Sequence, residues 1–166
     1  MAINDALVPE YDHEMGTTRR LLERVPEADF DWRPHDRSMT LGQLAGHLAN
    51  IPSWCATILD GSGFDLATRG DDARPKAPES RSALLQQFDA RIAEARAALV
   101  RSTDQELLTP WTLKLGSHEI FTLPRISALR SFVMNHSIHH RGQLSVYLRL
   151  RNVPLPAMYG PTADEQ

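Results

Sequence analysis

Three histidines fall within five residues of the segment NHSIHHRGQ, at positions 136, 139 and 140. Two imidazoles four positions apart on a helix lie about 40° apart around its axis, so His136 and His140 can bind one metal ion together. Histidine pairs at this spacing bind zinc in helical HExxH sites. Here no glutamate follows His136, so the general base of that protease motif is missing. The pair predicts a metal site but not a zinc protease.

Helical phase distinguishes His140 from His139 as the second ligand, because residues three apart are also neighbours on a helix. At roughly 100° per residue, His140 lies about 40° from His136 and His139 about 60° away on the other side. The apolar stripe of the segment places His140 inside it and His139 on its edge. We therefore expect His140 to point inward with the stripe, which comprises Leu129, Phe132, Val133 and Tyr147.

A third ligand should come from another segment, because two protein ligands rarely suffice. His47 is the leading candidate, one helical turn from Leu44 and from Ile51. The competing interpretation is that His47 is a hydrogen-bonded core residue, as a single histidine on an apolar helix face commonly is. Three imidazoles would leave coordination positions open, as in catalytic sites. Nitrogen ligands without thiolates suit zinc, nickel, iron or cobalt.

Two polar neighbours of the pair have different expected roles. Gln143 lies on the inward stripe, where a polar side chain needs a partner. It therefore either contacts a metal ligand or the substrate, or forms a simple hydrogen bond in the core. Arg141 should point away from the pair and either form a salt bridge or act at the helix terminus. The other histidines are expected at the surface or in loops: His13, His35, His118 and His139.

No carboxylate lies in register beside the histidines as an evident general base. Glu14, Glu79 and Glu165 are candidates only if folding brings one of them near the site. The catalytic residues are therefore left unassigned.

Four helices must position these residues. Apolar residues recur at helical spacing over about 4–25, from residue 40 to beyond Ile58, over about 80–100, and from Pro124 to about 151. A long crossover loop, residues 61–78, separates the second helix from the third. These features predict an all-α four-helix bundle.

Local signals refine this outline. Thr40 and Gln43 form a capping-box pattern at the start of the second helix, and Pro52 should kink it. Residues 111–123 contain two short apolar runs around Gly116 and Ser117, which predict a hairpin or an irregular lid before the last helix.

The composition is that of an ordinary globular protein, with 42% apolar and 23% charged residues among 166. A net charge of −3 argues against nucleic-acid binding, and no apolar run is long enough to span a membrane. The N-terminus lacks the blocks of a signal peptide, and the single cysteine, Cys55, suits a reducing cytoplasm. We expect one cytoplasmic domain over residues 1–166.

The sequence resembles the DinB-like family in three segments: DWRPHDRSMTLGQLAGHLA, HSIHHRGQLSVYLR and the closing PLPAMYGPTADE. The resemblance covers essentially the whole chain. It implies a four-helix bundle, often dimeric, with a metal ion held by one histidine of the second helix and two of the fourth. These positions match His47, His136 and His140.

The resemblance implies a range of activities. Relatives include thiol-dependent enzymes, namely mycothiol-dependent maleylpyruvate isomerases and bacillithiol S-transferases, as well as metal-dependent hydrolases. We therefore expect a metal-dependent thiol S-transferase or hydrolase acting on a small molecule, with a low-molecular-weight thiol as a second cofactor in the first case. The alternative is a non-catalytic, stress-associated module that binds a metal or ligand. A third hypothesis is that the histidines bind no metal.

Overall fold

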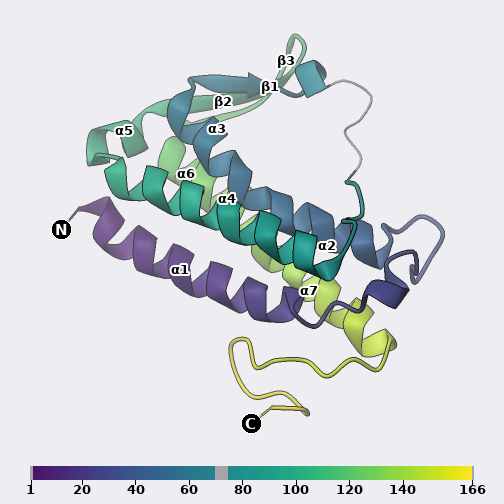
Figure 1. The fold of residues 1–166 in the computed structure, drawn as a ribbon. Helices are drawn as coiled ribbons and strands as arrows, with labels where there is room; N and C mark the ends of the chain where they lie inside the picture. The colour runs from purple at the N-terminus through teal and green to yellow at the C-terminus, as the bar shows by residue number, and fades with distance from the viewer. Residues whose placement is uncertain (1, 70–74, 166) are drawn as a thin grey trace.

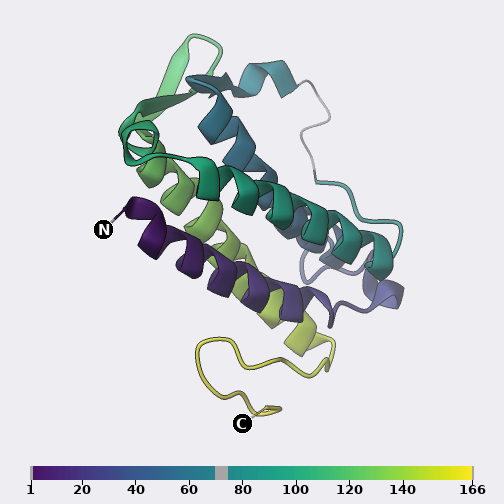
Figure 2. The same cartoon turned by 60° about the vertical axis from the view of Figure 1, so that its left-hand side comes forward.

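The bundle is built from helices that run side by side in the computed structural model, which describes residues 2–69 and 75–165 (Figure 1). Helix α1 (Ile3–Leu22) and helix α2 (Leu41–Asn50) each pack against both α4 (Arg81–Arg101) and α7 (His136–Leu150). The order around the core is therefore α1, α4, α2, α7. Figure 2 shows the same arrangement from a second direction.

The second helix begins and bends as its sequence predicts. The N–H of Gln43 donates to Oγ1 of Thr40 at 3.1 Å, and the N–H of Thr40 donates to Oε1 of Gln43 at 2.9 Å. This capping box fixes the start of α2. At Pro52 the helix changes into a 3-10 turn, Ile51–Ser53, and then continues as α3 (Trp54–Asp60).

The last helix is uninterrupted but irregular. Helix α6 (Arg125–Leu129) passes through a π-helical turn, Arg130–Asn135, into α7. A π turn shifts the helical phase of the residues before it relative to those after it. Met134 of this turn is buried at 3% exposure, whereas Phe132 stays partly exposed.

The prediction of an all-α chain is wrong. Three strands, β1 (Gly63–Asp65), β2 (Pro110–Leu115) and β3 (His118–Pro124), form a mixed sheet in the order β1-β2-β3. Strands β2 and β3 form the hairpin predicted over residues 111–123, with Leu115 opposite His118. The sheet lies at one end of the bundle, beyond α3 (Figure 1).

Strand β1 belongs to a segment predicted to be a solvated loop. It pairs in parallel with β2, with Gly63 opposite Thr112. A Cβ at Gly63 would lie 2.6 Å from the carbonyl oxygen of Thr112, so this approach requires glycine. A 3-10 turn, Leu66–Arg69, follows, and residues 70–74 of the predicted loop lie outside the described residues.

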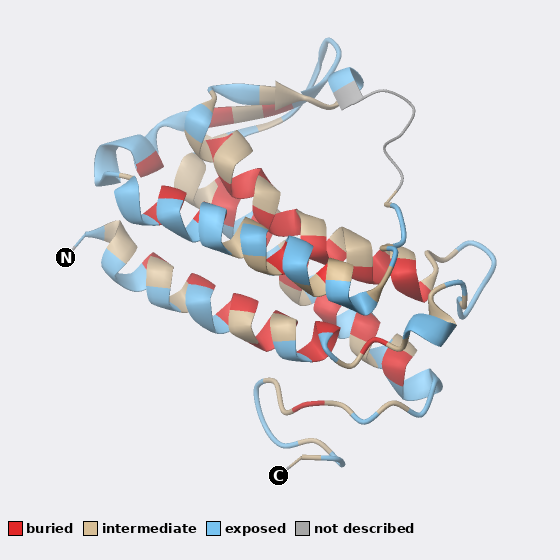
Figure 3. Ribbon diagram, viewed as in Figure 1, coloured by how far each residue is buried: buried red, intermediate tan, exposed pale blue. Residues whose placement is uncertain are grey.

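The core is filled by the inward stripes of the bundle helices (Figure 3). Leu84, Phe88, Ala95 and Leu99 carry the buried face of α4, as their spacing predicts. Shorter elements cover the ends: a 3-10 turn at Glu27–Asp29 and α5 at Asp104–Leu108. Within the described residues, no helix combines the length and hydropathy needed to cross a membrane.

The chain reverses direction after α7. Asn152 adopts a left-handed conformation with φ of 57°, and the N–H of Val153 donates to the carbonyl of Leu148 at 3.0 Å. This is a Schellman cap, which ends the helix and redirects the backbone. The tail therefore runs back beneath α1 and α7 (Figures 1 and 2).

Candidate metal centre

The three histidines singled out by the sequence converge where α2 packs against α7. His47 lies on α2, and His136 and His140 lie one turn apart on α7. The Nε2 atom of His47 is 3.3 Å from Nε2 of His136 and 3.1 Å from Nε2 of His140. The Nε2 atoms of His136 and His140 are 2.8 Å apart. One nitrogen from each ring thus faces a common point.

These separations fit ligation of one metal ion. Zinc–imidazole bonds of about 2.0–2.1 Å, at angles between octahedral and tetrahedral, separate ligand nitrogens by roughly 2.8–3.4 Å. All three measured Nε2 distances lie in this range. Among the described residues, these three histidines are the group of metal-ligating side chains close enough to hold an ion.

The partners of the other ring nitrogens support the same conclusion. Nδ1 of His140 lies 2.7 Å from Oε1 of Gln143, and Nδ1 of His136 lies 3.3 Å from the carbonyl oxygen of Phe132. Both oxygens accept hydrogen bonds, so they favour the tautomer with the proton on Nδ1 and a lone pair on Nε2. Two such lone pairs at 2.8 Å repel each other unless a cation lies between them.

The surroundings also favour neutral rings. Burial lowers the pKa of His136 below its ordinary value of 6.5, and it does the same for His140. The contacts to Phe132 and Gln143 oppose this shift without reversing it. Both side chains are therefore neutral near pH 7, which is the form that binds metal.

The third histidine of α7, His139, is not part of the cluster. His139 is exposed, and its ring stacks edge-on against that of His140 with centroids 4.9 Å apart. The remaining three histidines are exposed, as expected: His13, His35 and His118. Helical phase thus distinguished the inward-pointing residue correctly.

No carboxylate takes part in the cluster among the described residues. Glu14 is 7% exposed and is bound to Arg141, on the side of α7 that faces α1. Glu165 pairs with Arg24 at 2.6 Å in the tail, and Glu79 is exposed. The structure therefore identifies none of the three as a general base.

Aromatic rings border the cluster toward the sheet. The ring of Phe132 lies 5.6 Å from that of His136, and Trp54 packs edge-on against Phe132 at 4.9 Å and against Phe64 at 5.1 Å. Three nitrogen ligands from two helices would leave further positions of an ion free for a small molecule. The aromatic border makes one side of this site apolar.

The burial of Arg141 was not predicted from the sequence. Arg141 points away from the histidines and forms a salt bridge, as predicted, but it is only 1% exposed. A second stripe could have revealed this burial, because four buried residues recur at helical spacing on α7: Ser137, Arg141, Leu144 and Leu148.

Comparisons with known proteins agree with this architecture. The sequence profile of the DinB superfamily matches residues 10–144. The uncharacterized protein YrdA of Bacillus subtilis (strain 168) is 24% identical over 164 residues, which cover 97% of this chain and 90% of that protein.

Solved structures share the fold. A DinB-like protein from Bacillus cereus superposes with a TM-score of 0.70 at 21% identity, covering 95% of this chain and 98% of the other. The DinB-like protein YjoA from Bacillus subtilis superposes with a TM-score of 0.66 at 18% identity, covering 96% of this chain and 98% of the other. At these identities, the likeness concerns the fold alone.

Proposed function

This chain belongs to the DinB superfamily, and from that premise we propose that His47, His136 and His140 bind one divalent transition metal ion in an enzyme acting on a small molecule. The reaction would be thiol S-transfer or hydrolysis. Zinc, nickel, iron and cobalt all suit three imidazoles. In the first case a low-molecular-weight thiol would be the second cofactor.

One observation supports the metal above all others. The three Nε2 atoms lie within 3.3 Å of one another. In His136 and His140 the other ring nitrogen, Nδ1, faces an oxygen that can accept a hydrogen bond. With the proton of each ring on Nδ1, two lone pairs face one point, and a bound cation turns their repulsion into attraction.

The residues of the chain would perform defined tasks at this site. The three histidines hold the ion, and Gln143 keeps the proton of His140 on Nδ1. Phe132 and Trp54 make the side toward the sheet apolar. The bound metal would supply Lewis acidity, which lowers the pKa of a thiol or water at neutral pH.

Metal analysis of protein purified without a histidine tag tests the proposal directly. We expect close to one equivalent of a transition metal, or uptake of one equivalent of Co²⁺ or Zn²⁺ by stripped protein. Less than about 0.1 equivalent, with no uptake on titration, would rule out the metal site.

A non-catalytic, stress-associated binding module is the second candidate, because among the described residues no carboxylate joins the cluster as a general base. Assays with thiols and electrophiles, and with an ester panel, separate the two. Turnover that is lost in His140→Ala, with the helical circular dichroism unchanged, supports the enzyme. Metal binding without turnover on either panel supports the module.

We also expect a homodimer, which light scattering coupled to gel filtration tests. The expected mass is twice the 18.6 kDa of one chain. A mass of one chain at micromolar concentration would contradict this expectation.

A further inference from the structure

A buried ion pair lies on the face of α7 that packs against α1, next to the face that carries the histidines. Arg141 is 1% exposed, and its Nη2 lies 2.6 Å from Oε2 of Glu14 on α1. Its Nη1 donates to the carbonyl oxygen of Glu14 at 2.9 Å and to Oγ1 of Thr18 at 3.2 Å. The guanidinium therefore connects α7 to α1 through both of its terminal nitrogens.

Tyr159 of the tail completes this network. Its hydroxyl accepts from Nη2 of Arg141 and donates to Oε2 of Glu14 at 2.7 Å. The guanidinium carbon also lies 5.0 Å from the centroid of the tyrosine ring. We call Glu14, Arg141 and Tyr159 the Arg141 cluster.

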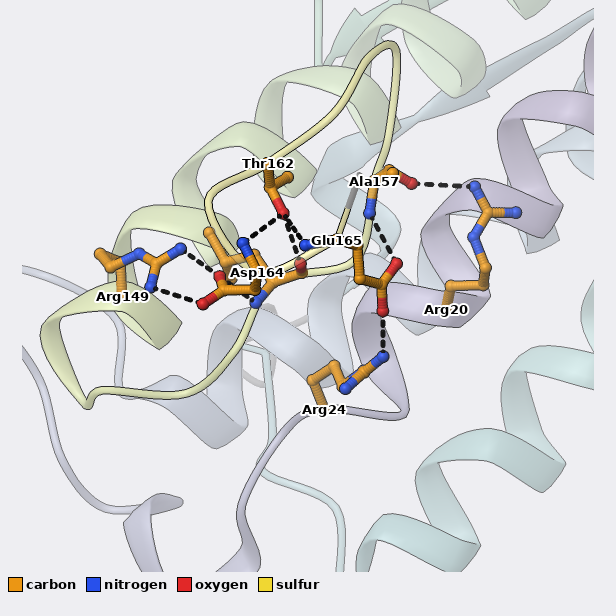
Figure 4. Close-up of polar contacts among 8 residues, drawn as sticks. Arg20, Arg24, Arg149, Ala157, Thr162, Asp164 and Glu165 are labelled. Atoms are coloured by element: carbon orange, nitrogen blue, oxygen red, sulfur yellow. Dashed lines mark hydrogen bonds and ion pairs between the residues drawn. The ribbon is translucent and has the colours of Figure 1, made fainter.

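The tail is held on α1 by Arg20 and Arg24 and on α7 by Arg149 (Figure 4). Glu165 binds Arg24 at 2.6 Å and accepts from the N–H of Ala157 at 3.0 Å. Arg20 donates to the carbonyl of Ala157 at 3.2 Å, and Arg149 pairs with Asp164. The tail thus closes into a loop that carries Tyr159 to the seam between α1 and α7.

Arg141 directly follows His140, so the rotation of α7 about its axis sets both side chains together. Side-chain tips lie about 5–6 Å from a helix axis, so a rotation of roughly 10° moves a tip by about 1 Å. Metal–ligand distances tolerate only about 0.2 Å. The rotation of α7 about its axis must therefore be fixed more closely for metal binding than for helix packing alone.

We propose that the Arg141 cluster positions the histidines of α7, and that the tail takes part through Tyr159. This inference rests on the proposed function, because it concerns the geometry of the same metal site. Replacing a buried ion pair by apolar residues is often neutral or stabilising, so stability alone does not explain a buried Arg141. A planar guanidinium with several fixed donors suits the task of setting an orientation.

Tyr159→Phe provides the test, since it removes one hydroxyl and keeps the ring over Arg141. Stripped wild-type and variant proteins are titrated with Co²⁺, and the d–d absorption bands at saturation report the ligand geometry. We expect shifted bands and an affinity about tenfold weaker, the lower end of the effect of residues behind metal ligands. Arg141→Lys keeps the positive charge but loses the planar guanidinium and its several fixed donors, so it should shift the bands further.

Arg96→Gln is the matched control, because it removes an exposed ion pair to Asp12 of α1, at 2.8 Å, and touches neither the tail nor the Arg141 cluster. We expect its cobalt spectrum to equal that of the wild type. Circular dichroism confirms that each variant is folded. If the wild type binds Co²⁺ and Tyr159→Phe shows the same bands and the same affinity, the positioning role is overturned and the metal site is not. A wild-type protein that takes up no Co²⁺ would overturn both.

Discussion

The imidazole of His140 has a different partner at each of its nitrogens. Gln143 accepts at Nδ1, and the other two histidines face Nε2. The side chain of Gln143 is exposed, so its hydrogen bond contributes little to folding. Its effect should instead appear in metal binding, because an acceptor at Nδ1 fixes the tautomer and raises the basicity of Nε2.

Replacing Gln143 tests this separation. We expect Gln143→Leu to weaken Zn²⁺ binding by about 10–100-fold, with the urea midpoint of the metal-free protein unchanged. Gln143→Glu keeps an acceptor of the same length and should bind at least as tightly as the wild type. Competition with a chromophoric chelator measures both affinities. Equal affinity in Gln143→Leu would show that the contact has no role.

The lowered pKa values of His136 and His140 give a pH prediction. Both rings favour the neutral form in the folded chain more than in the unfolded chain. The stability they contribute is therefore complete above pH 6.5, the unfolded value, and is lost as pH falls through the lower folded values. Metal affinity should decline below about pH 6.5 as protons compete for the same nitrogens.

Zn²⁺ titrations between pH 5 and 8 measure this decline, with urea unfolding of the metal-free protein alongside. We expect constant affinity above pH 7 and a fall below 6.5. An affinity independent of pH over the whole range would contradict imidazole ligation.

At the level of elements, the sequence predicted what depends on local periodicity. The helices, the capping box at Thr40 and the break at Pro52 all follow from nearby residues. Strand β1 does not, because three residues with no alternation become a strand only by pairing with β2, nearly 50 positions away. The convergence of His47 on α7 likewise depends on tertiary packing, which spacing within one helix cannot determine.

One tertiary contact makes a sharp prediction for α2. A Cβ at Gly46 would lie 2.4 Å from the carbonyl oxygen of Lys76, which belongs to the chain segment lying on that helix. A backbone carbonyl cannot move aside as the tip of a side chain can. We therefore expect the clash in Gly46→Ala to lower the unfolding free energy by roughly 1–3 kcal/mol. The higher helix propensity of alanine offsets up to about 1 kcal/mol of this loss.

Gly16→Ala on α1 is the matched control for Gly46→Ala. A Cβ at Gly16 meets nothing within 4 Å, so we expect a gain of about 0.5–1 kcal/mol from the helix propensity of alanine. Urea unfolding measures both variants. Two variants that change stability in the same direction would contradict the close contact at Gly46.

For the whole molecule, the histidine cluster connects folding to metal binding. The cluster joins α2 to α7, and without a cation it brings two unprotonated nitrogens to 2.8 Å at this seam. In the metal-free chain the lone pairs of these two nitrogens repel each other, and a bound metal ion relieves this repulsion. A ligand that binds only the folded state stabilises it by about 2.7 kcal/mol at a concentration 100 times its Kd.

His140→Leu should be at least as stable as the wild type in the presence of a chelator and less stable than the wild type in the presence of Zn²⁺. In chelator, the variant removes one lone pair and fills the same seam with an apolar side chain, so we expect a melting temperature equal to or above that of the wild type. With Zn²⁺ at 100 times the wild-type Kd, only the wild type should gain, by roughly 5–10 °C for a chain of this length. Differential scanning calorimetry measures all four conditions. If the variant is less stable than the wild type in chelator, His140 is mainly a core residue, because its replacement then weakens packing and relieves no repulsion.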